Sequence, residues 1–444
     1  MGVLEKALEM LQKYPLCDNC LGRQFALLGC NMENDERGKA IKLALILKAH
    51  DLALSRDEEG LRILKVLATN GFCQKAEEVI QKMRRRVFRK NLPKRCFLCE
   101  DKFQSLENIV QKAVENLSVY EYRSFLVGVE LPVHVEERED EFKAEFDVSY
   151  GENMRSEFGR LLGKKLAERA GKSVDYSKPE IVVLINPITE NVRLQVNPLY
   201  IAGYYKKLVR GIPQSKWLCS NCRGKGCEKC NWTGKMYAES VEEIIEKPFL
   251  EETCGSKASF HASGREDIDA RMLGKGRPFV IEISQPKKRF IDLKKMEEAV
   301  NLQAAGKVRI SNLCFVDKSV IRKLKKGEAF QKEYRVIIEF EEDVTDSELR
   351  LLEEKLARVM IKQRTPLRVM HRRADLTREK YIYEVKVKKL SPKRAEMKIK
   401  CQGGLYVKEL VTGDEGRTTP SVSEILKNKA KPIKLDVLNV IMHY

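Results

Sequence analysis

The sequence contains no long apolar run. No stretch reaches the roughly 18 consecutive apolar residues that a membrane-spanning helix needs. The N-terminal segment MGVLEKALEMLQKY has Leu4, Ala7, Leu8 and Leu11 at helical spacing with charged residues between them. It therefore lacks the continuous apolar core of a secretory signal peptide. Because the pattern offers neither a membrane span nor an export signal, we expect a cytoplasmic protein.

Sustained repeats and low-complexity tracts are also missing, and acidic residues are in the minority. The chain of 444 residues has 83 Lys and Arg against 65 Asp and Glu, which gives a net charge of +18 and a pI of about 9.2. The basic excess is spread along the chain, as in proteins whose working surface meets a polyanion such as a nucleic acid. A Lys- and Glu-rich surface adapted to heat is the alternative interpretation.

Cysteine is plentiful, but its grouping argues against a disulfide framework. Of the 13 cysteines, eight form four C-x-x-C pairs. In a cytosolic protein such pairs indicate a metal before a disulfide. We expect the scattered cysteines to be ordinary core or surface thiols: Cys30, Cys73, Cys254, Cys314 and Cys401.

One pair of C-x-x-C motifs lies within a short segment, CSNCRGKGCEKCNWTG. Four thiolates can surround one Zn²⁺ tetrahedrally, and glycines between them let the backbone turn tightly around the metal. Chaperones with cysteine-rich repeats have a similar motif in several copies, so a single copy indicates a structural knuckle. Reduced thiol turns without metal are the alternative. The predicted ligands are Cys219, Cys222, Cys227 and Cys230.

The other two pairs, Cys17 with Cys20 and Cys96 with Cys99, are far apart in the sequence. Each pair is half of a tetrahedral site, so we expect the two halves to close one zinc knot that clasps the N-terminus to the end of a helical region. A redox role is the alternative, although neither pair lies in a visible β-α-β context. No spare acidic or His ligand lies near either site, so both are expected to be structural.

Hydrophobic periodicity predicts mixed α and β structure. Residues from about 35 to 90 are expected to be helical, because KAIKLALILKAHDLAL and AEEVIQKMRRRVFRK have broad apolar stripes without Gly or Pro. In the middle of the chain we expect strands in YRSFLVGVELPVHV, EIVVLINP and VRLQV, and a helix in ENMRSEFGRLLGKKLAERAG that Gly171 ends. In the last two hundred or so residues the predicted strands include RPFVIEI, YRVIIEF and KYIYEVKV.

An acidic loop stands in a basic, glycine-rich stretch, FHASGREDIDARMLGKGRPFVIEIS. An aspartate with a pKa near 3.9 is ionised at neutral pH, and Arg265 and Arg271 would keep it so and aim it. Glu266 and Asp269 suggest a two-carboxylate or Mg²⁺ site, but the adjoining arginines would compete with the metal for the same oxygens. Taken alone, Gly-Arg-Glu-Asp is common in solvated turns.

Three segments together resemble one enzyme family. Gly264-Arg265-Glu266-Asp267 resembles the G-R-x-D signature of the nucleophilic aspartate of pseudouridine synthases, and with MLGKGRPF after it resembles the archaeal Pus-ten type of tRNA pseudouridine synthase. QKEYRVIIEF is similar to the K-x-Y-x-A/V strand that places a tyrosine, here Tyr334, under the target base. GGLYVKELV resembles the Y-I-R-x-L motif with Lys408 in place of the usual Arg, and Leu435 matches the closing apolar position.

The resemblance covers most of the chain and implies an α+β multidomain fold. The segment NVRLQVNPLYIAGYYKKLVRG resembles the end of a THUMP domain, a tRNA-binding α/β module. The implied order ends in a pseudouridine synthase-type mixed α+β catalytic domain. The expected regions are a zinc-bearing helical region (1–104), a THUMP-like module (105–215), a zinc knuckle (216–235) and the catalytic domain (236–444).

The resemblance also implies an activity, isomerisation of uridine to pseudouridine at positions fifty-four and fifty-five of the tRNA T-loop. The implied partner is tRNA, with no membrane and no small-molecule cofactor, so the cofactors are structural zinc alone, in two sites of a monomer. The implied roles are as follows: Asp267 is the nucleophile, Arg265 or Lys408 pairs with its carboxylate, Tyr334 stacks on the base, Tyr406 lies near the substrate, and Val407 and Leu435 form a dry wall.

Two other functional classes stay open at this point. A tRNA-binding protein with a dead catalytic domain is one, although the presence of Asp267, Tyr334 and Lys408 together argues against it. A metal-dependent nuclease is the other, and it would need clustered carboxylates and Mg²⁺. Within the first interpretation, Tyr381 and Tyr383 of KYIYEVKV are rivals to Tyr334.

Overall fold

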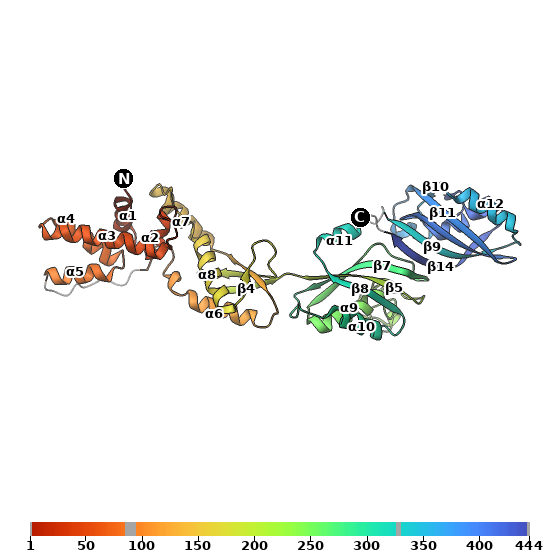
Figure 1. Cartoon of the computed structure of the whole chain (residues 1–444), viewed down its shortest axis with the longest axis horizontal. Helices are drawn as coiled ribbons and strands as arrows, with labels where there is room; N and C mark the ends of the chain where they lie inside the picture. The colour runs from red at the N-terminus through yellow and green to blue at the C-terminus, as the bar shows by residue number, and fades with distance from the viewer. Residues whose placement is uncertain (1, 85–94, 326–329, 442–444) are drawn as a thin grey trace. The chain divides into compact units, whose positions relative to one another are not determined.

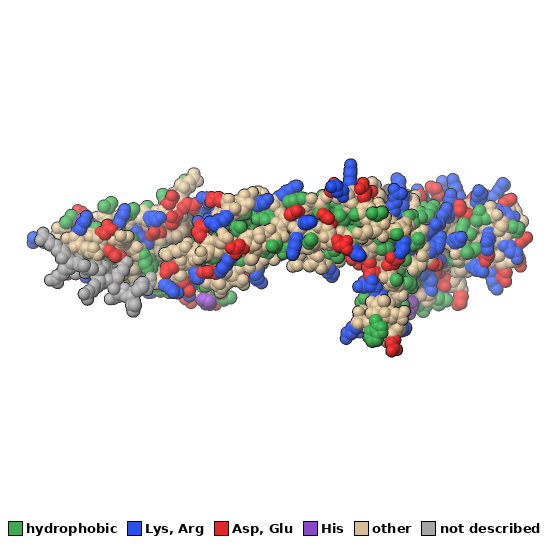
Figure 2. All heavy atoms as spheres, turned by 90° about the horizontal axis from the view of Figure 1, so that it is seen from below, with side chains coloured by type: hydrophobic (Ala, Val, Ile, Leu, Met, Phe, Trp, Pro, Cys, Tyr) green, Lys and Arg blue, Asp and Glu red, His purple; other side chains and the backbone are tan. Residues whose placement is uncertain are grey.

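A computed structural model describes residues 2–84, 95–325 and 330–441. The chain forms two compact units, residues 1–197 and residues 198–444 (Figure 1). Across the described ranges, no helix is long and apolar enough to pass through a membrane. On the face that Figure 2 shows, Lys and Arg side chains are distributed along the chain and mixed with Asp and Glu, as the sequence predicts.

The first unit begins with helices, and the predicted helical region is confirmed in its described part. In α1 the predicted apolar stripe is buried at Ala7 and Leu11. Residues 85–90, the end of the predicted helical region, lie outside the described residues. The helices are α1 (Val3–Lys13), α2 (Asp18–Gly22), the 3-10 turn η1 (Arg23–Phe25), α3 (Asn34–Leu54), α4 (Glu58–Thr69), α5 (Gln74–Arg84), η2 (Lys102–Gln104) and α6 (Leu106–Leu117).

A four-stranded sheet with two helices completes this unit. Its strand order is β2-β1-β3-β4; β1 is parallel to β2 and β3, and β3 is antiparallel to β4. The elements are β1 (Ser124–Val129), α7 (Val133–Glu145), α8 (Met154–Ala170), β2 (Ser173–Val174), β3 (Ile181–Asn186) and β4 (Asn191–Val196). The predicted helix over 152–171 is confirmed, and Gly171 ends it at a φ of +62°.

One predicted strand is too long. The strand expected over 122–135 ends at Val129, and Pro132 is the N-cap of α7. Proline is tolerated at the start of a helix because its missing N–H would have no partner there. Val133 and Val135 therefore belong to a helix, which the apolar run at the end of YRSFLVGVELPVHV conceals.

The second unit is built on one ten-stranded sheet of order β13-β10-β11-β12-β9-β14-β7-β5-β8, with β6 paired to β7. Only the β14–β7 pair is parallel among these described strands. The strands are β5 (Leu199–Lys207), β6 (Lys257–Ala262), β7 (Ala270–Ser284), β8 (Val308–Phe315), β9 (Gln331–Phe340), β10 (Val359–Arg364), β11 (Thr377–Ser391), β12 (Arg394–Gln402), β13 (Thr418–Thr419) and β14 (Ala430–Ile441).

Helices pack against this sheet in two separate hydrophobic cores. They are η3 (Glu228–Cys230), α9 (Val241–Thr253), α10 (Leu293–Gln303), α11 (Ser319–Lys325), α12 (Asp346–Leu356), η5 (Leu367–Arg372), α13 (Val407–Thr412) and α14 (Val422–Leu426). Residues of α9 and α10 pack with β5, β7 and β8, whereas residues of α12, α13 and α14 pack with β9 to β12. Tyr334 on β9 packs against both cores, so it stands where they meet.

Residues 198–215 differ from the expected domain scheme. They were assigned to the THUMP-like module, but β5 pairs with β7 and β8 in the second unit and buries Ile201 and Tyr205 there. The physical reason is sheet pairing, which sequence alternation cannot reveal, because β4 and β5 are separated by two residues and have the same period. The knuckle segment 216–235 consequently lies inside the second unit.

Candidate active site

The acidic loop connects β6 to β7 and is shaped by a glycine. Gly264 has a φ of +74°, a conformation that L side chains rarely adopt. A Cβ at this position would lie 3.2 Å from Nζ of Lys332. The backbone conformation therefore favours the glycine of the G-R-x-D pattern, and a side chain there would also have to displace the end of Lys332 slightly.

Glu266 is the buried anchor of this loop. Its side chain forms an ion pair of 3.0 Å with the buried Arg277 and accepts a hydrogen bond of 2.9 Å from Oη of Tyr205. Burial, followed by the nearby Glu266 carboxylate, raises the pKa of Tyr205 well above its ordinary value. The three groups satisfy one another in the core, so Glu266 is not half of an exposed two-carboxylate metal site.

Lys207 of β5 holds the backbone of the same loop. Its Nζ, which is buried, donates to the carbonyl oxygens of Asp267 (3.0 Å), Ile268 (3.2 Å) and Ile212 (2.9 Å). Burial disfavours the ammonium and lowers the pKa of Lys207, although Glu266 acts in the opposite direction. Because three carbonyls converge on one cation, the main chain at Asp267 is fixed.

Asp267 presents its carboxylate to two cations. Its side chain is 35% exposed, and Oδ2 lies 3.3 Å from Nη2 of Arg368 and 3.3 Å from Nζ of Lys408. Lys408 also binds Asp269 at 2.7 Å. Burial tends to raise the pKa of Asp269, but the hydrogen bond and charge of Lys408, together with the charge of Arg368 and a backbone hydrogen bond, lower it on balance. Both carboxylates therefore stand beside cationic side chains.

Arg368, on η5, was not found from the sequence. Its guanidinium also binds Glu409, and its central carbon lies 5.9 Å from the ring centroid of Tyr406. Burial lowers the pKa of Arg368, but the bonds to Glu409 and Asp267 raise it further, so the guanidinium stays charged. The segment RTPLRVMHRR has a basic cluster that could have drawn attention to it.

A cavity of about 630 Å³ opens beside Asp267. Its size falls in the range of roughly 300–1,000 Å³ typical of ligand sites. The structure brings every predicted catalytic and substrate-binding residue to its wall, namely Arg265, Asp267, Tyr334, Tyr406, Val407, Lys408 and Leu435. The motifs that carry the resemblance, far apart in the sequence, thus meet at one place.

The apolar part of the cavity lies where three strands pair. On β9 and β14, Tyr334 is opposite Val437 and Val336 is opposite Leu435. Leu435 also pairs with Ala270, directly after the acidic loop. Val407 and Leu435 are buried, and burial raises the pKa of Tyr334 above its ordinary range because the phenolate is disfavoured. Tyr334 is thus a neutral ring at neutral pH, set in a dry wall.

Tyr406 and Lys408 are positioned by the start of α13. Gln363 of β10 donates from Nε2 to the carbonyl of Tyr406 at 3.0 Å and accepts from its N–H at 2.8 Å. This reciprocal pair fixes the N-cap of the helix that carries Lys408. Tyr381 and Tyr383 instead contact each other on β11, with ring centroids 5.1 Å apart, and neither lines the cavity.

For two arginines, the structure differs from the expected pairing with the aspartate of the acidic loop. Arg271 was expected to hold the acidic loop's aspartate, but it binds Asp436 at 2.9 Å because these two residues are paired on the parallel strands β7 and β14. Arg265 lines the cavity, whereas the ion-pair partners of the Asp267 carboxylate in the described chain are Arg368 and Lys408.

The rest of the cavity wall is strongly basic. Burial lowers the pKa of Lys332 to about 8, and the neighbouring Arg277 adds to this effect. A site of this charge suits a polyanionic ligand. The further basic side chains on the wall are Lys325, Arg373, Arg378 and Lys380.

The knuckle segment brings four thiols together in the geometry of a zinc site. Sγ atoms of Cys219 and Cys227, and of Cys222 and Cys230, are 3.8 Å apart. A tetrahedron with Zn–S bonds of about 2.3 Å has edges of about 3.8 Å, whereas a disulfide bond is about 2.05 Å long. The N–H groups of Gly226 and Gly234 donate to Sγ of Cys222 and Cys230 at 3.2 Å.

The split cluster also assembles. Cys17, Cys20, Cys96 and Cys99 have all Sγ atoms within 4.8 Å of one another, and three of the four residues are buried. The N–H of Cys17 donates to Sγ of Cys96 at 3.4 Å, and Sγ of Cys17 lies 3.6 Å from that of Cys99. Both four-cysteine clusters therefore have the donors and spacing that Zn²⁺ requires, as predicted.

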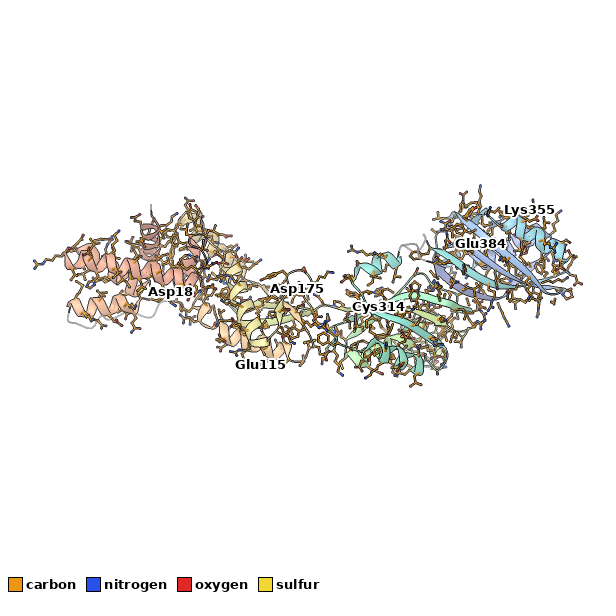
Figure 3. All side chains as sticks on the ribbon, in the orientation of Figure 1. Asp18, Glu115, Asp175, Cys314, Lys355 and Glu384 are labelled. Atoms are coloured by element: carbon orange, nitrogen blue, oxygen red, sulfur yellow. The ribbon has the colours of Figure 1, made fainter. Side chains whose placement is uncertain are left out.

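The remaining cysteines are separate thiols, as expected. Cys401 is buried, and burial raises its pKa to about 12. Cys73 is half-buried, while Cys30, Cys254 and Cys314 are exposed. Figure 3 labels Cys314, which lies on β8.

A mixed sheet that presents an aspartate, an aromatic ring and two cations in one basic cavity matches the site that the resemblance to pseudouridine synthases implies. Comparison with known families agrees: residues 200–441 match the family model "Pus10, C-terminal", and residues 109–186 match "Pus10 THUMP domain, archaeal". The chain belongs to the Pus10 family and is an RNA pseudouridine synthase, so the predicted fold class and enzyme class are confirmed.

Relatives named tRNA pseudouridine synthase Pus10 match over nearly the whole chain. The protein of Methanocaldococcus jannaschii is 48% identical, over 97% of this chain and 93% of its own length. That of Methanothrix thermoacetophila is 40% identical, over 99% and 94%. That of Pyrococcus furiosus is 37% identical, over 99% and 98%.

Proposed function

We propose that the protein isomerises uridine to pseudouridine in the T-loop of tRNA, at positions fifty-four and fifty-five, with Asp267 as the nucleophile. The observation that carries this proposal is the Asp267 carboxylate, held at 3.3 Å from each of two cations on the wall of a basic cavity. The full-length likeness to tRNA pseudouridine synthases supports tRNA as the substrate.

The reaction needs little more than a placed carboxylate. The N1–C1′ bond of uridine breaks, the base turns, C5 bonds to C1′, and the proton lost from C5 is balanced by one gained at N1. No net oxidation occurs, so no redox cofactor is required. Asp267 acts either by attack on C1′ or by abstraction of the 2′ proton, and in both routes Arg368 and Lys408 hold its carboxylate in place.

Tyr334 supplies the surface for the extruded base. A uridine inside a stacked loop must leave its stack to reach a carboxylate on the wall of a cavity, as in other base-modifying enzymes. The ring of Tyr334 lines the cavity together with Val407 and Leu435, which exclude water. Stacking on this ring would hold the base while its glycosidic bond is opened.

Contacts with the RNA backbone come from the THUMP-like module and from basic side chains around the cavity. Two basic runs of the sequence, QPKKRF and RKLKKG, are candidates for these phosphate contacts. In QPKKRF, Lys287 and Lys288 are exposed, whereas Arg289 is buried and is not a phosphate contact. The run RKLKKG lies partly outside the described residues. Phosphate contacts fix register without reading sequence, and binding should weaken steeply with salt.

Each four-cysteine cluster is proposed to hold one structural Zn²⁺. The donors are soft thiolates in closed sets of four, with no open position for a substrate. Zinc would stabilise the folds around residues 17–99 and 219–230 and would take no part in the isomerisation.

Incubation with an unmodified T-arm RNA, followed by chemical mapping of pseudouridine, tests the proposal. We expect pseudouridine at one or both T-loop uridines, unchanged when EDTA is added during the assay, and RNA of unchanged length. Shortened RNA that EDTA prevents would indicate a metal-dependent nuclease. In the part of the chain that the structure describes, the groups able to hold a metal are the two four-cysteine clusters. Binding without any pseudouridine would indicate a dead catalytic domain.

A further inference from the structure

A second cavity adjoins the acidic loop. It has a volume of about 260 Å³. It shares six residues with the larger cavity: Gln214, Arg265, Glu266, Asp267, Arg368 and Lys408. The acidic loop, its partner cations and Gln214 therefore stand between the two cavities.

Two aromatic side chains, Trp217 and Tyr237, line the second cavity and are absent from the wall of the first. Their ring centroids are 5.7 Å apart in an edge-on arrangement, and both side chains are half-buried. An aromatic wall beside a nucleophile is the device by which proteins hold unstacked RNA bases.

The zinc knuckle fixes these aromatics. Trp217 and Tyr237 lie on the two segments that enter and leave it, where the N–H of Met236 donates to the carbonyl of Trp217 at 2.9 Å. Two residues further in on each segment, the N–H of Cys219 donates to the carbonyl of Gly234 at 2.8 Å, and the N–H of Gly234 donates to Sγ of Cys230. The aromatic pair is therefore coupled directly to the four-cysteine cluster of the knuckle.

The segment that precedes Trp217 is tied to the acidic loop. Gln214 donates to the carbonyl of Gly264 at 2.9 Å, and its own carbonyl accepts from the N–H of Glu242 at 2.9 Å. The carbonyl of Pro213 accepts from the N–H of Val241 at 3.1 Å. This cavity is thus built from segments that are held in place on both sides.

We propose that the second cavity binds the base of a nucleotide adjacent to the target uridine, stacked on the ring of Trp217 with Tyr237 nearly perpendicular beside it, and that the zinc knuckle serves to place this pair. The inference rests on the proposed function, because it requires an opened RNA strand at Asp267. Two neighbouring nucleotides would then occupy cavities on either side of one loop, so that extrusion of the target base is coupled to capture of its neighbour.

A thermodynamic cycle tests this assignment. Dissociation constants are measured for the wild type and Trp217→Ala with a T-arm RNA, and with two RNAs that are abasic at the 5′ or the 3′ neighbour of the target. We expect Trp217→Ala and one of the abasic changes each to weaken binding about 10- to 100-fold, as loss of a stacked base does. When the protein and RNA changes are combined, the dissociation constant should rise no more than it does for the larger single change, within about twofold.

The cycle has internal controls. Trp232, at the exposed end of the knuckle with 73% of its surface accessible, gives the matched variant Trp232→Ala, in which the abasic penalty should stay at its wild-type value. Trp217→Leu keeps apolar bulk without an aromatic face and replaces Trp217→Ala if the latter loses zinc or thermal stability.

The assignment would be overturned if the effects of the Trp217 variant and the abasic RNA on the dissociation constant multiply. It would also be overturned if both Trp217 variants bind the RNA as tightly as the wild type. Pseudouridine formation by the wild type on the intact RNA is scored separately and tests the proposed function. If the enzyme is active but the Trp217 and abasic effects on binding are independent, only the proposed role of the second cavity is refuted. The cycle measures dissociation constants and therefore needs no turnover.

Discussion

The Nζ of Lys408 lies 3.3 Å from the Asp267 carboxylate and 2.7 Å from that of Asp269. Lys408 stands where the resembled motif usually has arginine, and an ammonium is a point charge without the fork of a guanidinium. Arg368 supplies a guanidinium from another element and reaches the same carboxylate. We infer that the two cations together hold the Asp267 carboxylate in position.

Replacing Asp267 tests the nucleophile. Asp267→Asn keeps the shape of the side chain but removes the charge, and an amide cannot replace a carboxylate in attack or proton abstraction. Because Lys207 binds the main-chain carbonyl of Asp267, the loop should keep its conformation. We expect tRNA binding within about twofold of wild type and no detectable pseudouridine by chemical mapping. Turnover by the purified variant would remove Asp267 from this role.

The paired cations give a second prediction. Arg368→Gln and Lys408→Gln should each lower kcat about 10- to 100-fold, since a hydrogen bond to a charged group contributes roughly 1.5–3 kcal/mol. Lys408→Arg, which restores the usual residue of the motif, should retain activity close to wild type. Because both cations act on one carboxylate, the double variant should fall short of the product of the single effects.

Single-turnover kinetics separate these effects from binding. Lys355, on α12 and labelled in Figure 3, does not line the cavity and provides the matched control Lys355→Gln. If the control loses as much activity as Arg368→Gln, the effect reflects net charge and not the Asp267 contact.

Much of the fold could be predicted from local pattern. The helices of the first unit follow from apolar stripes, as at Ala7 and Leu11, and the helix that ends at Gly171 follows from its C-cap. The two four-cysteine clusters could be recognised because thiol pairs have a characteristic spacing. The helices and each C-x-x-C pair depend on residues close together in the sequence, and the structure confirms them, together with the joining of two distant pairs in one cluster.

Features that depend on long-range pairing could not be predicted in this way. β5 was assigned to the wrong unit because its alternation fits any sheet. Glu266 resembles a solvated turn residue until Arg277 and Tyr205 are seen to enclose it. Arg368 lies on a 3-10 segment without periodicity, and only the tertiary fold brings it to Asp267.

Tyr334 provides a third prediction, which separates stacking from proton transfer. Tyr334→Phe keeps the ring and loses the hydroxyl, whereas Tyr334→Leu keeps bulk and loses the aromatic face. If stacking dominates, at roughly 1–3 kcal/mol per base, Phe should retain most of the activity and Leu should lose about 10- to 100-fold. If the hydroxyl moves a proton at C5, both variants should be nearly inactive while binding RNA. Full activity in both would exclude Tyr334 from the site.

Metal content gives a fourth prediction. Purified protein should contain about two Zn²⁺ per chain, one for each four-cysteine cluster. Cys219→Ser should remove about one zinc and lower the thermal midpoint, because one of four ligands is lost. Cys314→Ser, at an exposed cysteine outside both clusters, is the matched control and should leave both quantities unchanged. Elemental analysis near zero in protein prepared without chelators would contradict both sites.

The last prediction concerns stability in acid and Asp436, whose carboxylate contacts arginines on β7, on β9 and in the segment after β5. The carboxylate is buried on β14 and binds Arg271 at 2.9 Å, Arg335 at 2.8 Å and also Arg210. Burial alone would raise its pKa, but the hydrogen bonds from Arg271 and Arg335 outweigh burial and lower the pKa to about 2. The carboxylate should therefore stay ionised in the folded protein where it would protonate in the unfolded chain.

The sign of the effect follows from this difference. The pKa of Asp436 is about 2 in the folded protein and about 3.9 in the unfolded chain. Its contribution to the free energy of unfolding is therefore complete above about pH 4. It is lost as the pH falls toward 2, and its full size is about 2–3 kcal/mol. Urea unfolding of wild type and Asp436→Asn at pH 7 and at pH 3 should show a gap between them that narrows in acid. Asp343→Asn, at an exposed carboxylate, should show no such gap. A gap for Asp436→Asn that is the same size at both pH values would show that the arginine cluster does not hold the pKa of Asp436 down.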